Sequence, residues 1–329
     1  MSIVIAGYYG FGNAGDELIL LSLIQHFRFQ DPDVSITVLS RSPHLTSSAF
    51  DVHAVNRWFP WKWFLPLMHA KRFILGGGGL LQETSGPYNH FYYLTLLVIA
   101  KFFGCQTEVH AIGVDPVHGM FNRFWTKFAL NHWGDVISVR DEESRNALVD
   151  AGVQMTIAVQ PDPVYELRID SARQPSERVA LALSSSAFGS ARTGDIARLC
   201  TRIAAELHAP VDLLALFPAE DEALTRAIAR STRAVHQVRV AQNPLDILSW
   251  VKQYHLVVAS RFHALVLAAK YKIPFVGLGA EKKVASFCRT HQMPYANTRL
   301  IWNEDQLLAS IAALYQSNGK SVILASRTD

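Results

Sequence analysis

Cysteine is scarce in this sequence: the 329 residues include only three, and no two of them have a CxxC spacing. Cys105, Cys200 and Cys288 therefore indicate neither a disulfide framework nor a cysteine metal site, and we expect buried thiols in a reducing compartment. The sequence also lacks an HExxH motif, a paired His/Asp cluster and a Walker lysine. It therefore implies no metal.

Long hydrophobic runs are missing as well. The most apolar stretch, residues 92–100, ends at Lys101 and is too short to span a bilayer. A strand pattern starts directly after Met1, which predicts no secretory signal, so we expect a cytoplasmic protein. A net charge of +3 is too mild to indicate nucleic-acid binding, but it suits a protein that handles anions near a membrane.

Short β-branched runs alternate with longer helical patterns along the whole chain, which predicts parallel sheets with crossover helices. We expect strands near residues 2–6, 34–39, 72–75, 107–112, 136–139, 156–159, 179–183, 211–216, 235–240, 256–259 and 274–277. We expect helices near residues 15–30, 90–103, 119–132, 142–151, 194–207, 219–230, 244–253, 262–271, 281–290 and 304–317.

The length of the chain is sufficient for two domains, each with its own core. The polar, charged segment 166–176 predicts a linker between an N-terminal α/β domain, residues 1–166, and a C-terminal α/β domain, residues 177–329. We therefore expect two Rossmann-like domains facing a cleft, with the last helix packing back across the linker.

A glycine-rich loop follows the first predicted strand, and residues 7–17 read GYYGFGNAGDE. Glycines let backbone N–H groups approach a ligand closely, and the following helix start carries a partial positive charge. The loop therefore predicts a site for a phosphate or a carboxylate. The structural alternative is a turn that only packs the helix on the strand.

The same loop contains the spacing Gly10-x-Gly12-x-x-Gly15 of dinucleotide-binding proteins. That motif needs an acidic residue at the end of the second strand to hold the ribose. Here Ser40 and Arg41 follow that strand, so an NAD site is excluded and only an NADP variant is left open.

Two further strand ends carry candidate residues in the first half. Four consecutive glycines at residues 76–79 favour a backbone surface that contacts a ligand, with a tight packing corner as the alternative. Arg140 follows the strand at 136–139, where it can bind an anion through two hydrogen bonds or pair with Asp141 or Glu143. Asp141 is placed to cap the next helix.

In the second half, a buried strand breaks into a helix at Ser260, Arg261 and His263. Ser260 can cap the helix, Arg261 can bind an anion, and His263 can exchange a proton. Lys282 and Lys283 open the next helix. The segment 162–165, by contrast, is best explained as structural.

In chain order, residues 7–17 and 76–84, Ser138-Val139-Arg140-Asp141, Asp162-Pro163-Val164 and Ser260-Arg261-Phe262-His263 resemble the motifs of the polysaccharide pyruvyl transferase family, in particular its CsaB-like members. The resemblance implies a two-domain GT-B-like fold. It also implies transfer of the pyruvyl group of phosphoenolpyruvate onto two hydroxyls of a sugar as a cyclic ketal. The acceptor would belong to a cell-surface polysaccharide or its lipid-linked precursor.

Phosphoenolpyruvate carries a carboxylate and a phosphate close together, so a site without metal or other cofactor needs several cations and helix starts around it. Arg140 and Arg261 match this need, and by similarity Lys283 aligns with the family lysine, with Lys282 as the alternative. His263 is expected to protonate the methylene carbon of the enol.

The acidic residues Asp16, Glu17 and Glu83 are expected to bind or deprotonate the acceptor hydroxyls. The substrate-binding residues expected in total are Lys283, Lys282, Ser260, Gly12, Asn13, Gly15, Asp16, Glu17, Gly77, Gly78, Gly79 and Glu83. Residues 111–116 and 219–221 depart from the family pattern, so the acceptor sugar cannot be inferred from the family.

Residues 58–68 contain three of the seven tryptophans and precede Lys71 and Arg72. Aromatic residues beside cations suit a bilayer interface, so the segment predicts peripheral membrane contact at the inner face, with an aromatic cover over the core as the alternative. Two other functions also stay open because a fold does not decide chemistry. They are a GT-B glycosyltransferase with a nucleotide-sugar donor, and an anion receptor without catalysis.

Overall fold

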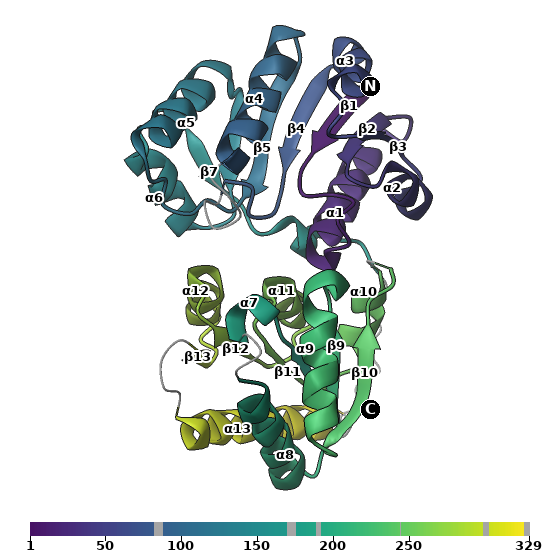
Figure 1. Cartoon of the computed structure of the whole chain (residues 1–329), viewed down its shortest axis with the longest axis vertical. Coiled ribbons are helices and arrows are strands. Elements are labelled where there is room, and N and C mark those ends of the chain that lie inside the picture. Colours follow the sequence, from purple (N-terminus) through teal and green to yellow (C-terminus); the bar gives the residue numbers. More distant parts are fainter. Residues whose placement is uncertain (82–87, 170–175, 189–191, 244, 299–302, 326–329) are drawn as a thin grey trace. The chain divides into compact units, whose positions relative to one another are not determined.

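The computed structural model describes the chain except for residues 82–87, 170–175, 189–191, 244, 299–302 and 326–329 (Figure 1). Side chains are also left undescribed at 88, 89 and 318–325. The chain forms two compact units, Met1–Arg168 and Ile169–Asp329. The boundary between them lies inside the polar segment 166–176.

Unit 1 contains a seven-stranded parallel sheet in the order β3-β2-β1-β4-β5-β6-β7. Its strands are β1 (Ser2–Ala6), β2 (Ser35–Ser40), β3 (His53–Asn56), β4 (Arg72–Gly76), β5 (Gln106–Ile112), β6 (Val136–Val139) and β7 (Ile157–Val159). Its helices are α1 (Ala14–Gln30), α2 (Pro43–Phe50), α3 (Pro60–His69), α4 (Tyr88–Phe102), α5 (Met120–Trp133), α6 (Glu142–Asp150) and the 3-10 turn η2 (Pro163–Glu166).

The central strands of unit 1 are almost fully buried, whereas the edge strands β3 and β7 are partly exposed. Val4, Phe73 and Leu75 belong to one core cluster with residues of α3, α4, α5 and α6, so these four helices cover the same face of the sheet. Ile5 and Ile74, which point to the other face, are equally buried.

Unit 2 contains a six-stranded parallel sheet in the order β10-β9-β8-β11-β12-β13. Its strands are β8 (Val179–Ala182), β9 (Val211–Ala215), β10 (Val235–Val240), β11 (Leu256–Ala259), β12 (Phe275–Gly279) and β13 (Tyr295–Asn297). Its helices are α7 (Ser185–Phe188), α8 (Thr193–Leu207), α9 (Pro218–Ser231), α10 (Asp246–Val251), α11 (Phe262–Lys270), α12 (Lys282–Thr290) and α13 (Glu304–Ala325).

Each sheet has one point where the strand order reverses. In unit 1 it lies between β1 and β4, and in unit 2 between β8 and β11. In open α/β sheets, ligands bind at such a point, outside the carboxyl ends of the strands, where the loops after the two central strands diverge. The loop at 7–13 and the glycines at 77–79 flank the first reversal, and Ser260 with Arg261 flanks the second.

The last helix, α13, packs on α8 of the same unit, where Arg202 pairs with Glu304 at 3.2 Å and Asp305 at 2.6 Å. The Tyr315 hydroxyl donates to the Glu177 carbonyl at 2.9 Å. Linker residues 170–175 lie outside the described residues, so contact of this helix with the linker stays a prediction.

The expected fold class, two parallel-sheet α/β domains, is confirmed. The sequence missed six elements: α2, β3, α3, η2, α7 and β13. Two of them are edge strands of four and three residues, too short to give a periodic pattern.

The three cysteines are buried as expected. No helix of the described chain is long and apolar enough to cross a membrane.

Candidate active site

The glycine loop of unit 1 folds back onto an acidic residue of its own helix. The Gly10 N–H donates to Glu17 Oε1 at 2.7 Å, and the amides of Phe11 and Gly12 also interact with this buried carboxylate. The pKa of Glu17 is raised to about 7, mainly by burial and also by neighbouring Asp16, although the amides act in the opposite direction. Amides predicted for an external anion therefore already contact a carboxylate of the chain.

Asn13 begins α1 as its N-cap. Its Oδ1 accepts from the Gly15 N–H at 3.1 Å, which satisfies one of the unpaired amides of the first turn. Gly12 has a φ of +80°, and a Cβ there would meet no atom within 4 Å. Gly12 is thus a glycine because of its backbone angle, and it lies at an open position of the loop.

The second glycine run lies against α1. A Cβ on Gly76 would come 2.4 Å from Leu23 Cδ1, and one on Gly77 would come 2.0 Å from Ile19 Cγ2. These two glycines are explained by close packing, which was the alternative interpretation of the run. Contact of Gly77, Gly78 and Gly79 with a ligand stays a prediction.

Gly78 connects this run to the other predicted residues of unit 1. A Cβ on Gly78 would come 2.5 Å from Asp16 Oδ1, and its carbonyl accepts from the Gly113 N–H at 2.8 Å. A Cβ on Gly113 would in turn come 2.4 Å from Nη2 of Arg140. The loops after β1, β4, β5 and β6 are therefore neighbours at one edge of the sheet.

Arg140 is more enclosed than its position at a strand end suggests. Only 5% of its side chain is exposed, and its Nε lies 3.3 Å from Asp141 Oδ2. Asp141 also caps α6, as predicted, by accepting from the Ser144 N–H at 2.7 Å. The pairing with Asp141 is thus present, and anion binding by Arg140 stays a prediction.

Sequence analysis overlooked Arg57, which directly follows β3. Its Nη1 donates to the Gly7 carbonyl at 2.8 Å and its Nη2 to the Tyr93 hydroxyl at 3.2 Å. Its guanidinium lies 4.6 to 5.3 Å from the ring centres of Phe11, Trp58, Tyr92 and Tyr93. This buried arginine fixes the start of the glycine loop, and only recognition of β3 could have revealed it.

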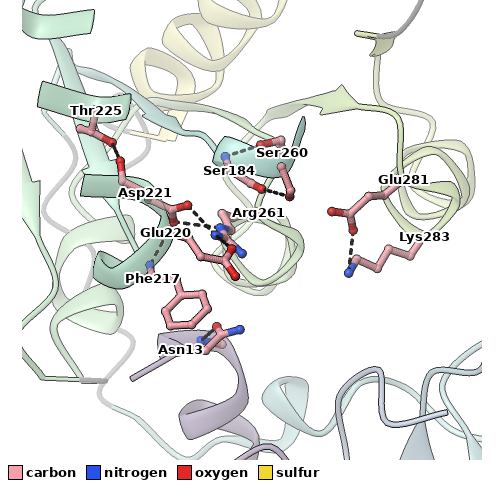
Figure 2. Close-up of polar contacts among 12 residues, drawn as sticks. Asn13, Ser184, Phe217, Glu220, Asp221, Thr225, Ser260, Arg261, Glu281 and Lys283 are labelled. Carbon is pink, nitrogen blue, oxygen red and sulfur yellow. Dashed lines mark hydrogen bonds and ion pairs between the residues drawn. The ribbon is translucent and has the colours of Figure 1, made fainter. Parts of the chain in front are cut away.

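Arg261 of unit 2 is held by two carboxylates of α9 (Figure 2). Its Nε donates to Asp221 Oδ2 at 2.8 Å, and its Nη2 contacts Asp221 Oδ1 and lies 2.7 Å from Glu220 Oε2. The Asp221 side chain is fully buried, whereas that of Glu220 is 45% exposed. Burial raises the pKa of Asp221, and Arg261 opposes that rise.

Asp221 is itself fixed from both sides. Its Oδ2 accepts from the Phe217 N–H at 3.0 Å, and its carbonyl accepts from the Thr225 hydroxyl at 2.7 Å. The sequence identified residues 219–221 only as a departure from the family pattern. Their place directly after the predicted strand 211–216 was the signal that could have revealed them.

The expectation that Ser260 caps α11 is wrong: the helix begins at Phe262, as predicted, and its N-cap is Arg261, without a side-chain cap. Ser260 Oγ instead accepts from the Ser184 N–H at 2.7 Å (Figure 2). This bond joins the ends of β8 and β11 at the reversal of the strand order.

His263 lies in the first turn of α11, half-buried and edge-on to Phe262 at 5.4 Å. Lys282 and Lys283 open α12, as predicted, and Lys283 Nζ lies 2.6 Å from Glu281 Oε2. This pair stands apart from the Arg261 contacts in Figure 2. Glu83 lies outside the described residues, where the structure does not test its role.

Asp162 behaves as the structural residue that the sequence suggested, since it is buried and its side chain accepts from the Val164 N–H at 3.0 Å. In the part of the chain that the structure describes, no three His, Cys, Asp or Glu side chains come together as a metal site.

A family model described as polysaccharide pyruvyl transferase matches residues 13–281. The chain belongs to this family. The match includes the capping Asn13, Arg140, the Ser260–His263 junction and Glu281, so it spans both sheet reversals. The resemblance identified from the sequence motifs is therefore confirmed. No curated protein matches the sequence significantly.

Solved structures show the same fold at low identity. The UDP-GlcNAc 2-epimerase of Methanocaldococcus jannaschii, in complex with UDP-GlcNAc and UDP, has a TM-score of 0.61 at 9% identity, over 96% of this chain and 93% of that chain. That of Neisseria meningitidis, bound to UDP-GlcNAc, has a TM-score of 0.61 at 11% identity over 96% and 92%. ADP-heptose lps heptosyltransferase II of E. coli has a TM-score of 0.54 at 15% identity over 97% and 100%. The GT-B-like fold is thereby established.

Proposed function

We propose that this family member transfers the pyruvyl group of phosphoenolpyruvate to two hydroxyls of one sugar residue and forms a cyclic ketal. The observation that carries the proposal is the junction of β11 and α11, where Arg261 and His263 flank the sheet reversal of unit 2. A fixed guanidinium beside an imidazole suits an anionic donor that must be protonated on carbon.

Arg261 binds the donor when an anionic group of the donor replaces one of the two carboxylates that pair with this arginine. Buried Asp221 holds Nε and one edge of the guanidinium, so the group is oriented before substrate arrives. The Glu220 side chain is 45% exposed, so it can move away from Arg261 at little cost in free energy. A carboxylate or phosphate of the donor can then replace it on Nη2 of Arg261. Lys283 adds a second cation after leaving Glu281.

The reaction begins when His263 gives its proton to the methylene carbon, and the adjacent carbon becomes an oxocarbenium-like centre. One sugar hydroxyl attacks this centre, the carbon–oxygen bond to phosphate breaks, and phosphate leaves. The second hydroxyl then closes the ring. Of the two hydroxyl protons released, one restores His263 and the other leaves with phosphate.

Glu17 is our choice for the group that first receives the hydroxyl proton that later leaves with phosphate, in preference to Asp16 and Glu83. Its pKa of about 7 is suited to a base that works near neutral pH. Its partner Gly12 lies at an open position of the glycine loop, where a sugar can approach.

The decisive experiment incubates the protein with phosphoenolpyruvate and a panel of nitrophenyl hexosides and follows phosphate release together with acceptor mass. We expect turnover in the wild type and a loss of about 100-fold or more in His263→Ala and Arg261→Ala. Matched controls are His44→Ala on α2 and Arg226→Ala on α9, whose side chain pairs with Glu222 in solvent.

Other outcomes would contradict the proposal in distinct ways. Thermal stabilisation by a nucleotide sugar but not by phosphoenolpyruvate would indicate a GT-B glycosyltransferase. Stabilisation by phosphoenolpyruvate without turnover on any acceptor would indicate an anion receptor.

A further inference from the structure

Three neighbouring helices on one face of the unit 1 sheet contain no acidic residue. The helices α3, α4 and α5 have 10, 15 and 14 residues and include neither Asp nor Glu. Their charged residues are all cationic: Lys62, Lys101, Arg123 and Lys127. Such a charge bias is unusual for helices at a protein surface, which normally mix both signs.

The first of these helices, α3, is apolar on both sides. Trp63 and Leu67 point into the core. On the outside, Trp61 is 67% exposed, and Phe64, Leu65 and Met68 are exposed with it at the spacing of one helical stripe. A helix that is apolar all round is normally buried, so α3 lacks a cover on its outer side.

Exposed apolar side chains also lie on α4 and on α5. The ring centres of Phe64 and Phe103 are 5.8 Å apart. The neighbouring Phe102, at the end of α4, has a side chain that is 88% exposed. Near the other end of α4, Phe91 lies 6.0 Å from Phe121, which is exposed on α5 with Met120 and Phe124. In unit 2, by contrast, Leu245 is the single large apolar side chain exposed among the described residues.

We propose that this outer surface of α3, α4 and α5 docks the protein on an anionic lipid bilayer. Aromatic side chains next to cations, with no acid among them, match the boundary between headgroups and acyl chains. Lys62 lies 5.7 Å from the ring centre of Phe59, and its stem can follow the aromatic surface while its charge reaches a headgroup phosphate. The proposal extends the contact predicted for residues 58–68 to three helices.

A second copy of the chain suits this surface less well. A symmetric dimer places the same patch on both subunits, so Lys62, Arg123 and Lys127 would face their own copies without an acid from these helices between them, whereas Lys101 is already paired with Asp135 at 2.5 Å. An anionic bilayer supplies the missing negative charge over the whole area.

The test is co-sedimentation of the full-length protein with phosphatidylcholine vesicles that contain or lack phosphatidylglycerol. We expect binding that needs the anionic lipid and weakens with salt. The combined change Trp61→Ser, Phe64→Ser and Leu65→Ser should lower the partition coefficient about tenfold or more. The control changes Phe29→Ser and Leu45→Ser, exposed residues of α1 and α2, should leave it unaltered.

Tryptophan fluorescence of the wild type gives a second measurement that needs no variant. Brominated lipids should quench it if Trp61 enters the bilayer. Turnover of a water-soluble hexoside should be unaltered in the triple variant, which keeps this proposal separate from the proposed reaction. Absence of vesicle binding, equal binding by the triple variant, or a dimer that only the triple variant loses would overturn the membrane assignment.

Discussion

At the two sheet reversals of this protein, buried charged side chains have opposite kinds of partner. In unit 1, backbone amides of a glycine loop surround the buried carboxylate of Glu17, which holds a proton near neutral pH. In unit 2, a buried carboxylate on a neighbouring helix holds the guanidinium of Arg261. At the first reversal a carboxylate is thus held by backbone amides, and at the second an arginine is held by a carboxylate.

Removal of the Asp221 side chain should have the largest effect on stability, because it breaks the ion pair that distinguishes the reversal in unit 2 from the reversal in unit 1. Asp221→Ala leaves the buried Arg261 without its main partner and should lower the free energy of unfolding of unit 2 by about 3–5 kcal/mol. Denaturant unfolding followed by circular dichroism measures the loss. Glu220→Ala is the matched control and should cost less than about 1 kcal/mol, because this pair is half in solvent. Equal effects of the two changes would mean that Asp221 does not fix the arginine.

Glu17 should make the stability of unit 1 depend on pH. Its folded-state pKa of about 7 lies above the ordinary value of 4.5, so the folded state binds the proton more tightly. The resulting stability is complete below pH 4.5 and is lost as the pH rises through 7, by about 3 kcal/mol at most.

Glu17→Gln keeps an oxygen for the Gly10 amide and should remove this pH dependence. Exposed Glu142→Gln should retain it. Unfolding curves across this pH range test both variants. A wild type whose stability rises over the same range would contradict the raised pKa.

The two glycine segments of unit 1 should differ in their tolerance of a methyl group. Gly77→Ala combines a positive φ with a Cβ 2.0 Å from Ile19, whereas Gly12→Ala combines a similar φ with open space. We expect Gly77→Ala to be the more destabilising change by about 2 kcal/mol, as measured by thermal unfolding. Equal losses would show that the loop relaxes away from α1.

Lys283 should give the smallest effect on stability. Lys283→Ala removes a half-exposed pair with Glu281, so we expect a change below about 1 kcal/mol. Because we assign Lys283 to the donor, KM for phosphoenolpyruvate should nevertheless rise, and Lys282→Ala should leave it unchanged. The opposite result would assign the neighbouring lysine to the donor.

The fold was largely predictable because apolar β-branched runs and helical patterns recur with regular spacing. Edge strands β3 and β13 were missed because they are short and only partly buried. Once β3 was missed, Arg57 could not be placed at a strand end. Local patterns predicted the central strands and the edge strands β7 and β10, but not the edge strands β3 and β13.

Candidate residues at strand ends were predictable for the same reason, but their partners were not. Asp221 lies 40 residues before Arg261 in the sequence, and only tertiary packing reveals that they pair. The contact between Glu17 and Gly10 depends on the positive φ angles of Gly10 and Gly12, which a motif does not specify. Ser260 was expected to cap the helix at 262–271, but Arg261 occupies the N-cap position.

The close contact between Gly113 and Arg140 has a consequence for how such sequences can diverge. The guanidinium occupies the space that any side chain at position 113 would need. A larger residue at 113 is therefore compatible only with a smaller or redirected one at 140, and the two positions should vary as a pair among homologues. The glycine thus limits which ancestors could have acquired this arginine.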